Sequence, residues 1–316
     1  MGRTRDIIQE IADVRHRRRF GSAMAELPLR LFALEHAFKK HDKSEDELTR
    51  YFPVALIACV EGYFRMAIKE LVDAGEPYLS NAEKQAFSIK LDFSVLRAIH
   101  GKTITVGEFV AHSVQLSRLE HLEAVLSNLL NTGFLQAIRA TTNRWAHEVK
   151  GQPVTPILAK PDEVFADVAR TFELRHIICH EIASAYEIEP EEVTRCFESC
   201  VVFLRAADEF ISETIHPGAP LTQTEMNIAA RQSLEERREQ LADAVAELRS
   251  RLDAAELAAF DESQEKWQTY CDAWADFVAG ERASSGTIWP LNYAGEAEAV
   301  VKRRLEEVSC YKRLGD

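Results

Sequence analysis

The sequence PVALIACVEGYFRMAIKELV, residues 53–72, is the strongest core segment of this 316-residue chain. Its first half is apolar almost all round, which is typical of a helix buried on every side. Pro53 suits the first turn of a helix, and Gly75 is a common stop signal. We therefore predict a central helix over residues 53–74 and expect the rest of the fold to pack around it.

Most of the remaining chain repeats apolar residues every three or four positions, and no strand is predicted. We expect helices in the segments 27–41, 83–87, 93–100, 106–116, 119–130, 161–186, 190–215 and 296–308, and two long antiparallel helices within 222–283 that reverse near 252–254. The segment His216-Pro217-Gly218-Ala219-Pro220 would interrupt any helix. The predicted organisation is all-α, with a basic arm (1–26), a helical bundle domain (27–215) and an acidic long-helix hairpin domain (221–316).

The amino-acid composition limits the class of protein to which the chain can belong. With 46% hydrophobic and 28% charged residues, the chain can bury sizeable cores. The N-terminal segment lacks a signal-peptide core and no run approaches 18 apolar residues, so we expect a cytoplasmic protein without membrane contact. Six cysteines occur singly: Cys59, Cys179, Cys196, Cys200, Cys271 and Cys310. Cys196 and Cys200 share a helix face and could hold a metal, although buried free thiols are the preferred interpretation.

The net charge of -13 is unevenly distributed. Residues 1–150 carry 21 Lys and Arg against 19 Asp and Glu, whereas residues 151–316 carry 17 against 32. Any contact with a polyanion must therefore be local, because phosphate binding needs clustered cations. The cluster Arg15, Arg17, Arg18 and Arg19 is a candidate RNA-binding site. The alternative is a solvated helix end whose cations interact with the helix dipole.

The segment Arg175-His176-Ile177-Ile178-Cys179-His180-Glu181 places a cation and two imidazoles in an apolar helical run. Burying such groups is costly unless they are paired, so they require a partner or a function. Arg-x4-His with a polar residue directly after the arginine resembles the motif of the HEPN superfamily of ribonucleases. Residues 56–65, LIACVEGYFR, also resemble the first core helix of its RiboL-PSP-HEPN branch.

The HEPN resemblance extends over residues 50–215 and implies a metal-independent endoribonuclease of a toxin or phage-defence type. It implies Arg175 and His180 as catalytic residues with His176 beside them, RNA as substrate, no cofactor, and an antitoxin or sensor protein as a partner. The chemistry is consistent, because cleavage needs a base for the 2′-hydroxyl and a cation for the developing phosphate charge. On one helix Arg175 and His180 point about 140° apart, so the hypothesis requires a homodimer with a composite site.

Two alternatives remain for these residues. His176 and His180 have the spacing of metal ligands on a helix, although no third ligand is marked. A structural interface is also consistent, with the cations paired to Glu173, Glu181 or a partner helix, which would make the chain an inactive interaction or scaffold protein. Glu61 and Arg65 interrupt the central helix four residues apart, which predicts an ion pair or, alternatively, a supporting role in the site.

The C-terminal region has a separate resemblance. Residues 267–273, WQTYCDA, together with Ser285-Gly286-Thr287-Ile288, Tyr293 and Arg304-Leu305, are similar to the lysozyme-inhibitor LprI family. That family pairs two cysteines, whereas Ala275 and Glu296 occupy the corresponding positions here. The resemblance over residues 262–310 therefore implies a helical scaffold used for dimer or partner contact, or for sensing, in place of secreted lysozyme inhibition.

Overall fold

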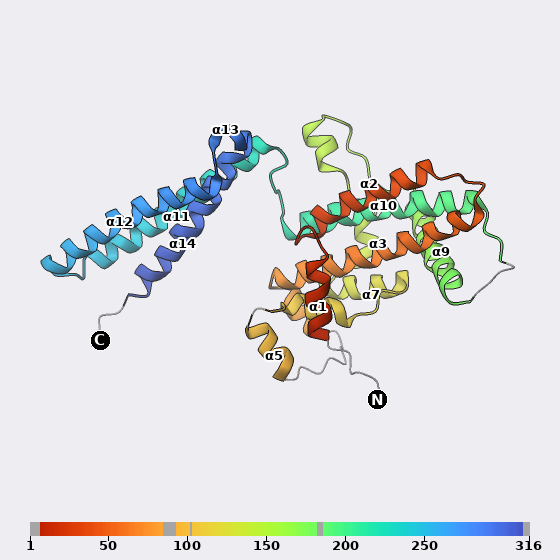
Figure 1. Cartoon of the computed structure of the whole chain (residues 1–316), viewed down its shortest axis with the longest axis horizontal. Helices are drawn as coiled ribbons and strands as arrows, with labels where there is room; N and C mark the ends of the chain where they lie inside the picture. The colour runs from red at the N-terminus through yellow and green to blue at the C-terminus, as the bar shows by residue number, and fades with distance from the viewer. Residues whose placement is uncertain (1–6, 85–92, 102, 182–185, 312–316) are drawn as a thin grey trace. The chain divides into compact units, whose positions relative to one another are not determined.

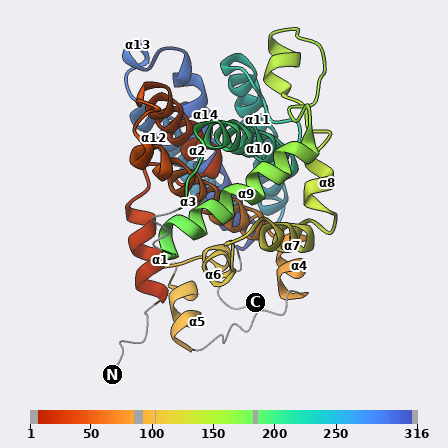
Figure 2. The same ribbon diagram turned by 90° about the vertical axis from the view of Figure 1, so that its right-hand side faces the viewer.

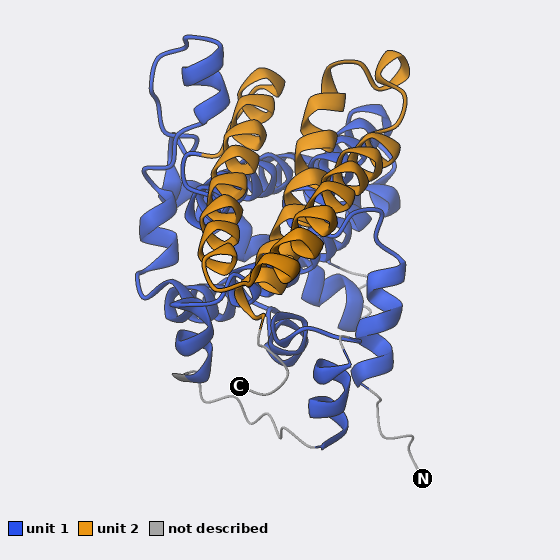
Figure 3. Ribbon diagram, turned by 90° about the vertical axis from the view of Figure 1, so that its left-hand side faces the viewer, with its two compact units in different colours: residues 1–218 blue, residues 219–316 orange. Residues whose placement is uncertain are grey.

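The computed structural model describes residues 7–84, 93–101, 103–181 and 186–311. In this part of the chain all regular structure is helical (Figure 1), apart from one isolated antiparallel bridge between Thr142 and Pro156. The all-α fold predicted from apolar spacing is thus confirmed. The chain forms two compact units, residues 1–218 and 219–316, which Figure 3 colours separately.

The first unit is built on one central helix. α3 (Asp46–Asp73) packs most extensively against α2 (Ala23–Lys40), α6 (Val106–Ser113), α9 (Pro161–His180) and α10 (Pro190–Ile215), several of which surround it in Figure 2. The predicted core segment is not buried all round, since Ala58 is exposed, and its fully buried side chains lie along one face of the helix: Leu56, Ile57, Val60, Phe64, Ala67, Ile68 and Leu71. The central position predicted for this segment is confirmed.

The start of α3 differs from the prediction. The helix begins at Asp46, so Pro53 lies inside it and not in its first turn. Asp46 and Glu47 provide an acidic first turn, which stabilises the start of a helix. The helix therefore begins before the predicted start at Pro53. α3 is also long and apolar enough by composition to cross a membrane, contrary to the expectation that no segment reaches that length, but 61% of its most apolar window is buried inside the unit. Its apolar character is that of a core helix.

Shorter helices complete the first unit: α1 (Ile7–His16), α4 (Tyr78–Lys84), α5 (Phe93–His100), α7 (Leu119–Leu130), α8 (Phe134–Ile138) and a π-helical turn (Trp145–Val149). The predicted bounds 93–100 and 119–130 match α5 and α7. Residues 85–92 and 182–185, in which parts of two predicted helices fall, lie outside the described residues. α1 contributes Ile11 to a small separate cluster with Val95, Ile104 and Phe109.

The second unit consists of three long helices and two short elements. α11 (Gln223–Arg249) and α12 (Ala254–Ala279) follow one another, and α14 (Trp289–Ser309) packs against both; α13 (Arg282–Ser285) and a 3-10 turn (Gly286–Ile288) connect the last two. Capping boxes fix both long-helix starts, with Thr222 and Glu225 at α11 and Asp253 and Glu256 at α12. The predicted reversal near 252–254 is confirmed, whereas the last helix begins earlier than predicted, with Pro290 in its first turn.

Candidate functional site

The helix that carries the Arg-x4-His segment is well defined. α9 has Pro161 in its first turn and acidic residues after it, and it ends at His180, where the Glu181 backbone N–H donates to the Ile177 carbonyl. Its buried face packs into the first unit through Phe165, Val168, Phe172 and Leu174. Arg175 is half-buried, while His176, Cys179 and His180 are exposed. The segment therefore lies at the surface end of a firmly packed helix.

A groove of about 700 Å³ runs between the last turns of α9 and the start of α7. Four basic groups line it: Arg118 directly before α7, His121 within α7, and Arg175 and His176 of α9. Three carboxylates share the lining: Glu120, Glu173 and Glu181. The groove is thus polar and mixed in charge. Arg118 and His121 were not singled out in the sequence, because they carry no motif and their proximity to α9 is a tertiary contact.

Arg175 has an acidic neighbour from the central helix. Its Nη2 atom lies 4.0 Å from Oε1 of Glu61, and both side chains are half-buried. The Glu61–Arg65 ion pair predicted from their spacing is not formed in the described structure. Arg65 instead donates to the Ala111 carbonyl of α6 at 3.0 Å, because its side chain extends toward that helix. Glu61 therefore neutralises the candidate catalytic arginine, and Arg65 fixes the packing of α6 on α3.

The two histidines lie next to each other at the end of α9, with ring centroids 5.1 Å apart. His176 Nε2 is 3.9 Å from Oε1 of Glu181, which matches the structural pairing considered for this segment. His176 lines the groove beside Arg175, whereas His180 is not among the lining residues. This is the divergence expected for residues five apart on a helix. A single copy of the chain brings together Arg175 and His176 and leaves His180 outside.

The N-terminal arginine cluster is only partly free. Arg15 is in the last turn of α1, where its Nε donates to Oε1 of Glu108 at 2.9 Å and its Nη2 pairs with the second carboxylate oxygen. Burial lowers the pKa of Arg18 from its usual value. Arg17 and Arg19 are exposed, and the Arg19 guanidinium lies 5.5 Å from the ring centroid of Phe20. The cluster therefore offers two exposed cations for an anion, since Arg15 holds α1 to α6.

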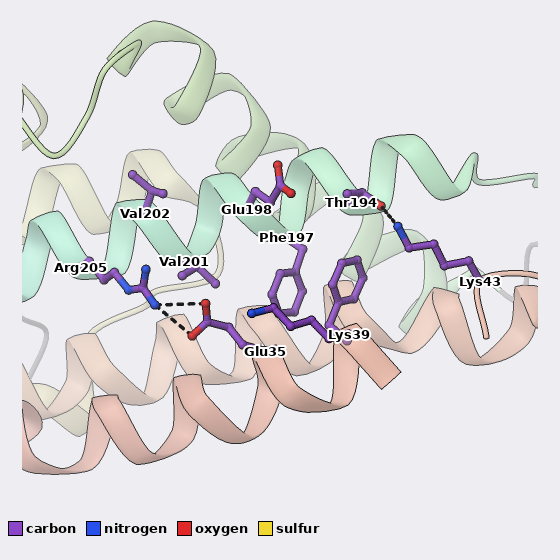
Figure 4. A pocket seen from close by; sticks show the side chains of 10 residues that line it. Glu35, Lys39, Lys43, Thr194, Phe197, Glu198, Val201, Val202 and Arg205 are labelled. Carbon is purple, nitrogen blue, oxygen red and sulfur yellow. Dashed lines mark hydrogen bonds and ion pairs between the residues drawn. The ribbon is translucent and has the colours of Figure 1, made fainter. Parts of the chain in front are cut away.

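A second groove of about 440 Å³ separates α2 and α10 (Figure 4). Its floor contains Phe38 and Phe197, whose parallel rings are stacked 4.1 Å apart. Arg205 closes one end by donating to both carboxylate oxygens of Glu35 at 3.0 and 3.1 Å. At the other end Lys43 reaches Thr194 at 3.5 Å, as Figure 4 shows. These contacts tie the two helices together across a shallow apolar floor.

In the second unit Phe260, Trp267 and Tyr293 pack against the core, whereas three aromatic side chains of α12 are exposed. Tyr270, Trp274 and Phe277 of α12 are 50%, 38% and 76% exposed. Their rings form a continuous row, with centroids 6.3 Å apart for Tyr270 and Trp274 and 5.8 Å apart for Trp274 and Phe277. We call these three residues the α12 aromatic row. Exposed apolar surfaces of this kind, gathered on one helix, are typical of protein-binding sites.

Polar contacts hold the rest of this unit in place. Asp272 of α12 accepts a hydrogen bond from the Tyr293 hydroxyl at 3.2 Å and lies 3.7 Å from Nη2 of Arg238. Tyr293 in turn stacks on Trp289 at 5.1 Å. These contacts join α11, α12 and α14 on the side of α12 that carries Asp272. The Tyr270, Trp274 and Phe277 rings are left exposed.

All six cysteines are free thiols in the structure, four buried and two, Cys179 and Cys310, exposed. Burial raises the pKa of Cys59 to about 11 and that of Cys200 to about 12, which makes both thiols unreactive at neutral pH. Cys271 is buried against the Ala297 carbonyl at 3.9 Å. Ala275, at one of the positions where LprI proteins have a cysteine, is fully buried, and Glu296, at the other, is half-buried. No group of three metal-ligating side chains occurs among the residues described.

The fold and these sites define an all-helical protein of two units, with a mixed-charge groove on the first and an aromatic row on the second. The sequence model of the family described as Lysozyme inhibitor LprI matches residues 217–308, which is less than a third of the chain and nearly all of the second unit. No curated protein and no solved structure matches the chain. The LprI resemblance of the second unit is therefore supported, whereas these comparisons give no support to the HEPN resemblance.

Proposed function

We propose that this chain is a helical interaction protein whose second unit docks another protein through the α12 aromatic row. The observation that carries the proposal is the exposure of Tyr270, Trp274 and Phe277 as a continuous row on one helix. Aromatic side chains supply large contact area at low entropic cost, which is why they are enriched at protein interfaces. The match of this unit to a family named for inhibiting an enzyme is consistent with a protein-binding role.

A photo-crosslinking experiment tests the proposal directly. p-Benzoylphenylalanine replaces Phe277 in the full-length chain, and the matched control replaces Phe32 of α2, a phenylalanine of similar exposure at 71%. Irradiation in cells is expected to give a discrete protein adduct at position 277 and none at position 32. Absence of an adduct at position 277, or equal adducts at both positions, would contradict docking through α12. Purified lysozyme serves as one defined candidate in the same assay.

A second candidate function is RNA cleavage at the groove between α7 and α9. It is favoured by the convergence of Arg118, His121, Arg175 and His176 on one groove. An imidazole can accept the 2′-hydroxyl proton, and a guanidinium can stabilise charge on the phosphate. Because His180 lies outside the groove, a site that uses Arg175 and His180 together needs a second copy of the chain, as the HEPN resemblance implies.

RNA cleavage in the presence of EDTA separates the two functions. The ribonuclease proposal expects cleavage by the wild-type chain, with losses of at least 100-fold in Arg175→Ala and His180→Ala. Arg195→Ala is the control, because Arg195 lies on α10 and pairs with Asp167 at 3.1 Å, outside the groove lining. Equal or absent cleavage in all proteins rules out catalysis at this groove, and loss of activity with EDTA indicates a metal.

A further inference from the structure

We infer that a groove between α11 and α14 binds a small organic acid, with the apolar body of the acid against aromatic side chains of α14 and its carboxylate at Arg231 and Arg238 of α11. The groove lies within the second unit, and its lining residues all belong to these two helices. The inference therefore goes beyond the proposed docking through the α12 aromatic row and does not depend on it.

The groove has the size and the lining of a small-molecule site. Its volume is about 500 Å³, and pockets for small molecules commonly enclose about 300–1,000 Å³. α14 contributes Trp289, Pro290 and Tyr293, and α11 contributes Ile228, which is 51% exposed. The Trp289 and Tyr293 rings are stacked with their centroids 5.1 Å apart, so they form one apolar wall. An apolar group placed in the groove would remove these surfaces from water, which favours binding.

Hydrogen bonds fix both sides of this groove. On α14, Nε1 of Trp289 donates to the Gly280 carbonyl at 2.9 Å, which sets the orientation of the indole ring. On α11, Nδ2 of Asn227 donates to the Thr287 carbonyl at 3.0 Å, which ties the start of that helix to the turn before α14. The site is therefore formed in advance, and a ligand binds without the cost of ordering these side chains.

Two arginines supply the positive charge of the groove. Arg231 and Arg238 are seven residues apart, which places them about two turns apart on one side of α11. Arg231 lies 3.4 Å from Glu235, and Arg238 lies 3.7 Å from Asp272. Within the described part of the chain, neither guanidinium donates a hydrogen bond in these contacts. A guanidinium carries a fork of N–H donors that matches a carboxylate, so both side chains have donors available for one.

The carboxylates beside these arginines compete only weakly with a ligand. The Arg231 and Glu235 side chains are 74% and 58% exposed, and ion pairs this exposed to water contribute little. Asp272 accepts a hydrogen bond from the Tyr293 hydroxyl, so it keeps a partner when Arg238 turns to a ligand. The groove lining itself carries two arginines and one glutamate, which favours an anion.

Isothermal titration calorimetry of the full-length chain with naphthalene compounds tests this recognition. Naphthylacetate carries the carboxylate, whereas naphthylethanol is a neutral compound and naphthylethylamine a cationic compound of similar size. We expect the acid to bind about tenfold more tightly than either of the others, because only a carboxylate can accept hydrogen bonds from the arginines and pair with their charge. Equal binding of the acid and the alcohol, or no binding of the acid at millimolar concentration, overturns the inference.

Substitutions of the arginines test where the carboxylate binds. Arg231→Gln and Arg238→Gln are each expected to weaken the binding of naphthylacetate by about fivefold to tenfold and to leave that of naphthylethanol unchanged. Arg251→Gln is the matched control, because Arg251 is an exposed arginine of the same unit that pairs with Glu247 outside the groove. Equal losses of affinity in all these variants would reflect net charge alone and would overturn the inference.

A substitution in the apolar wall tests where the body of the acid lies. Ile228→Asp puts a carboxylate into this wall and is expected to weaken the binding of naphthylacetate by about tenfold or more. Val278→Asp makes a similar change on α12, at a position that is 41% exposed, and is expected to leave the affinity unchanged. Both positions are exposed, so neither substitution removes a core side chain. If the affinity survives Ile228→Asp, or falls equally in both variants, the acid does not bind in this groove.

These results are independent of the crosslinking at position 277. Binding of the acid without an adduct on α12 leaves this inference standing and contradicts only the docking proposal. An adduct on α12 without binding of the acid does the reverse.

Discussion

The two units place their aromatic residues in opposite ways. In the first unit Phe64, Phe134 and Phe203 are fully buried and contact one another, with the Phe64 ring 5.8 Å from each of the other two. In the second unit the buried positions of α12 and α14 are mostly small, among them Ala275, Ala294, Ala297, Val300 and Val301, while the aromatic row of α12 faces outward.

This difference separates residues that stabilise the fold from residues available for binding. Small side chains let helices approach closely, so α12 and α14 meet mainly through alanine and valine. The exposed rings of Tyr270, Trp274 and Phe277 then contribute little to the folding of the second unit. In the first unit the rings fill the space between α3, α8 and α10, and few remain at the surface as a continuous group.

The largest expected effect is at Phe64. Phe64→Ala leaves a cavity at the centre of the first unit and should lower its free energy of unfolding by about 3–5 kcal/mol. Phe277→Ala removes the same ring from the surface of the second unit and should change stability by less than about 0.5 kcal/mol. Hydrogen exchange of the full-length chain measures both changes in stability, because the amides of α3 report on the first unit and those of α14 report on the second. If Phe277→Ala lowers the free energy of unfolding as much as Phe64→Ala does, the α12 aromatic row belongs to the core of the second unit.

A smaller loss of stability is expected when a larger side chain is placed in the interior of the second unit. Ala297 is fully buried, and its carbonyl contacts the thiol of Cys271. Ala297→Leu adds bulk where α14 meets α12 and should destabilise that unit by about 1–3 kcal/mol. Exchange in α11, α12 and α14 should increase while α3 is unchanged. Ala299→Leu, at an exposed position two residues away, is the matched control and should have little effect.

The fold could be predicted from sequence mainly where apolar spacing is dense. The segment 53–72 is so apolar that only a central position suits it, and α5 and α7 have clear ends. The prediction of a helix boundary was wrong where a second signal competed: the acidic first turn at Asp46 outweighs the start suggested by Pro53. The start of α14 at Trp289 was missed because its first residues resemble a loop.

The candidate sites were less predictable, because they depend on contacts between distant segments. The Arg175 segment was visible as an unusual set of polar groups, but its neighbours Arg118 and His121 are more than fifty residues away in sequence. The pairing of Glu61 with Arg175 likewise could not be read from spacing, which favoured Arg65. Spacing alone also does not show which aromatic residues of α12 are covered and which are exposed.

A pH-dependent effect distinguishes the two units further, because the first unit buries a carboxyl group. Burial raises the pKa of Asp208 to about 6 from an ordinary value of 3.8, partly offset by a hydrogen bond from the Tyr63 hydroxyl and reinforced by Glu209 and Glu70. The folded state therefore binds this proton more tightly than the unfolded state. The stability it contributes is complete below about pH 4 and is lost as the pH rises through 6.

Asp208→Asn removes this titration and keeps an acceptor for Tyr63. We expect the variant to be more stable than wild type by about 1–2 kcal/mol at pH 7.5 and to show no gain at pH 4. Urea denaturation at the two pH values, followed by exchange in α10, measures the difference. An equal change at both pH values would mean that the substitution acts through packing alone.

The smallest expected effect concerns the charge balance of the groove between α7 and α9. Arg175 lies 4.0 Å from Glu61, so the groove can accept an anion at this arginine only in competition with that carboxylate. Glu61→Gln removes the competing charge and should raise the affinity for a short RNA by about twofold to threefold, the range expected for a partly exposed pair. Glu163→Gln is the control, because it breaks the exposed contact with Lys160 at the opposite end of α9. Fluorescence anisotropy at low salt measures both variants. If the two affinities rise equally, the change reflects net charge alone and Arg175 has no part in anion binding; a rise confined to Glu61→Gln assigns the anion to this groove.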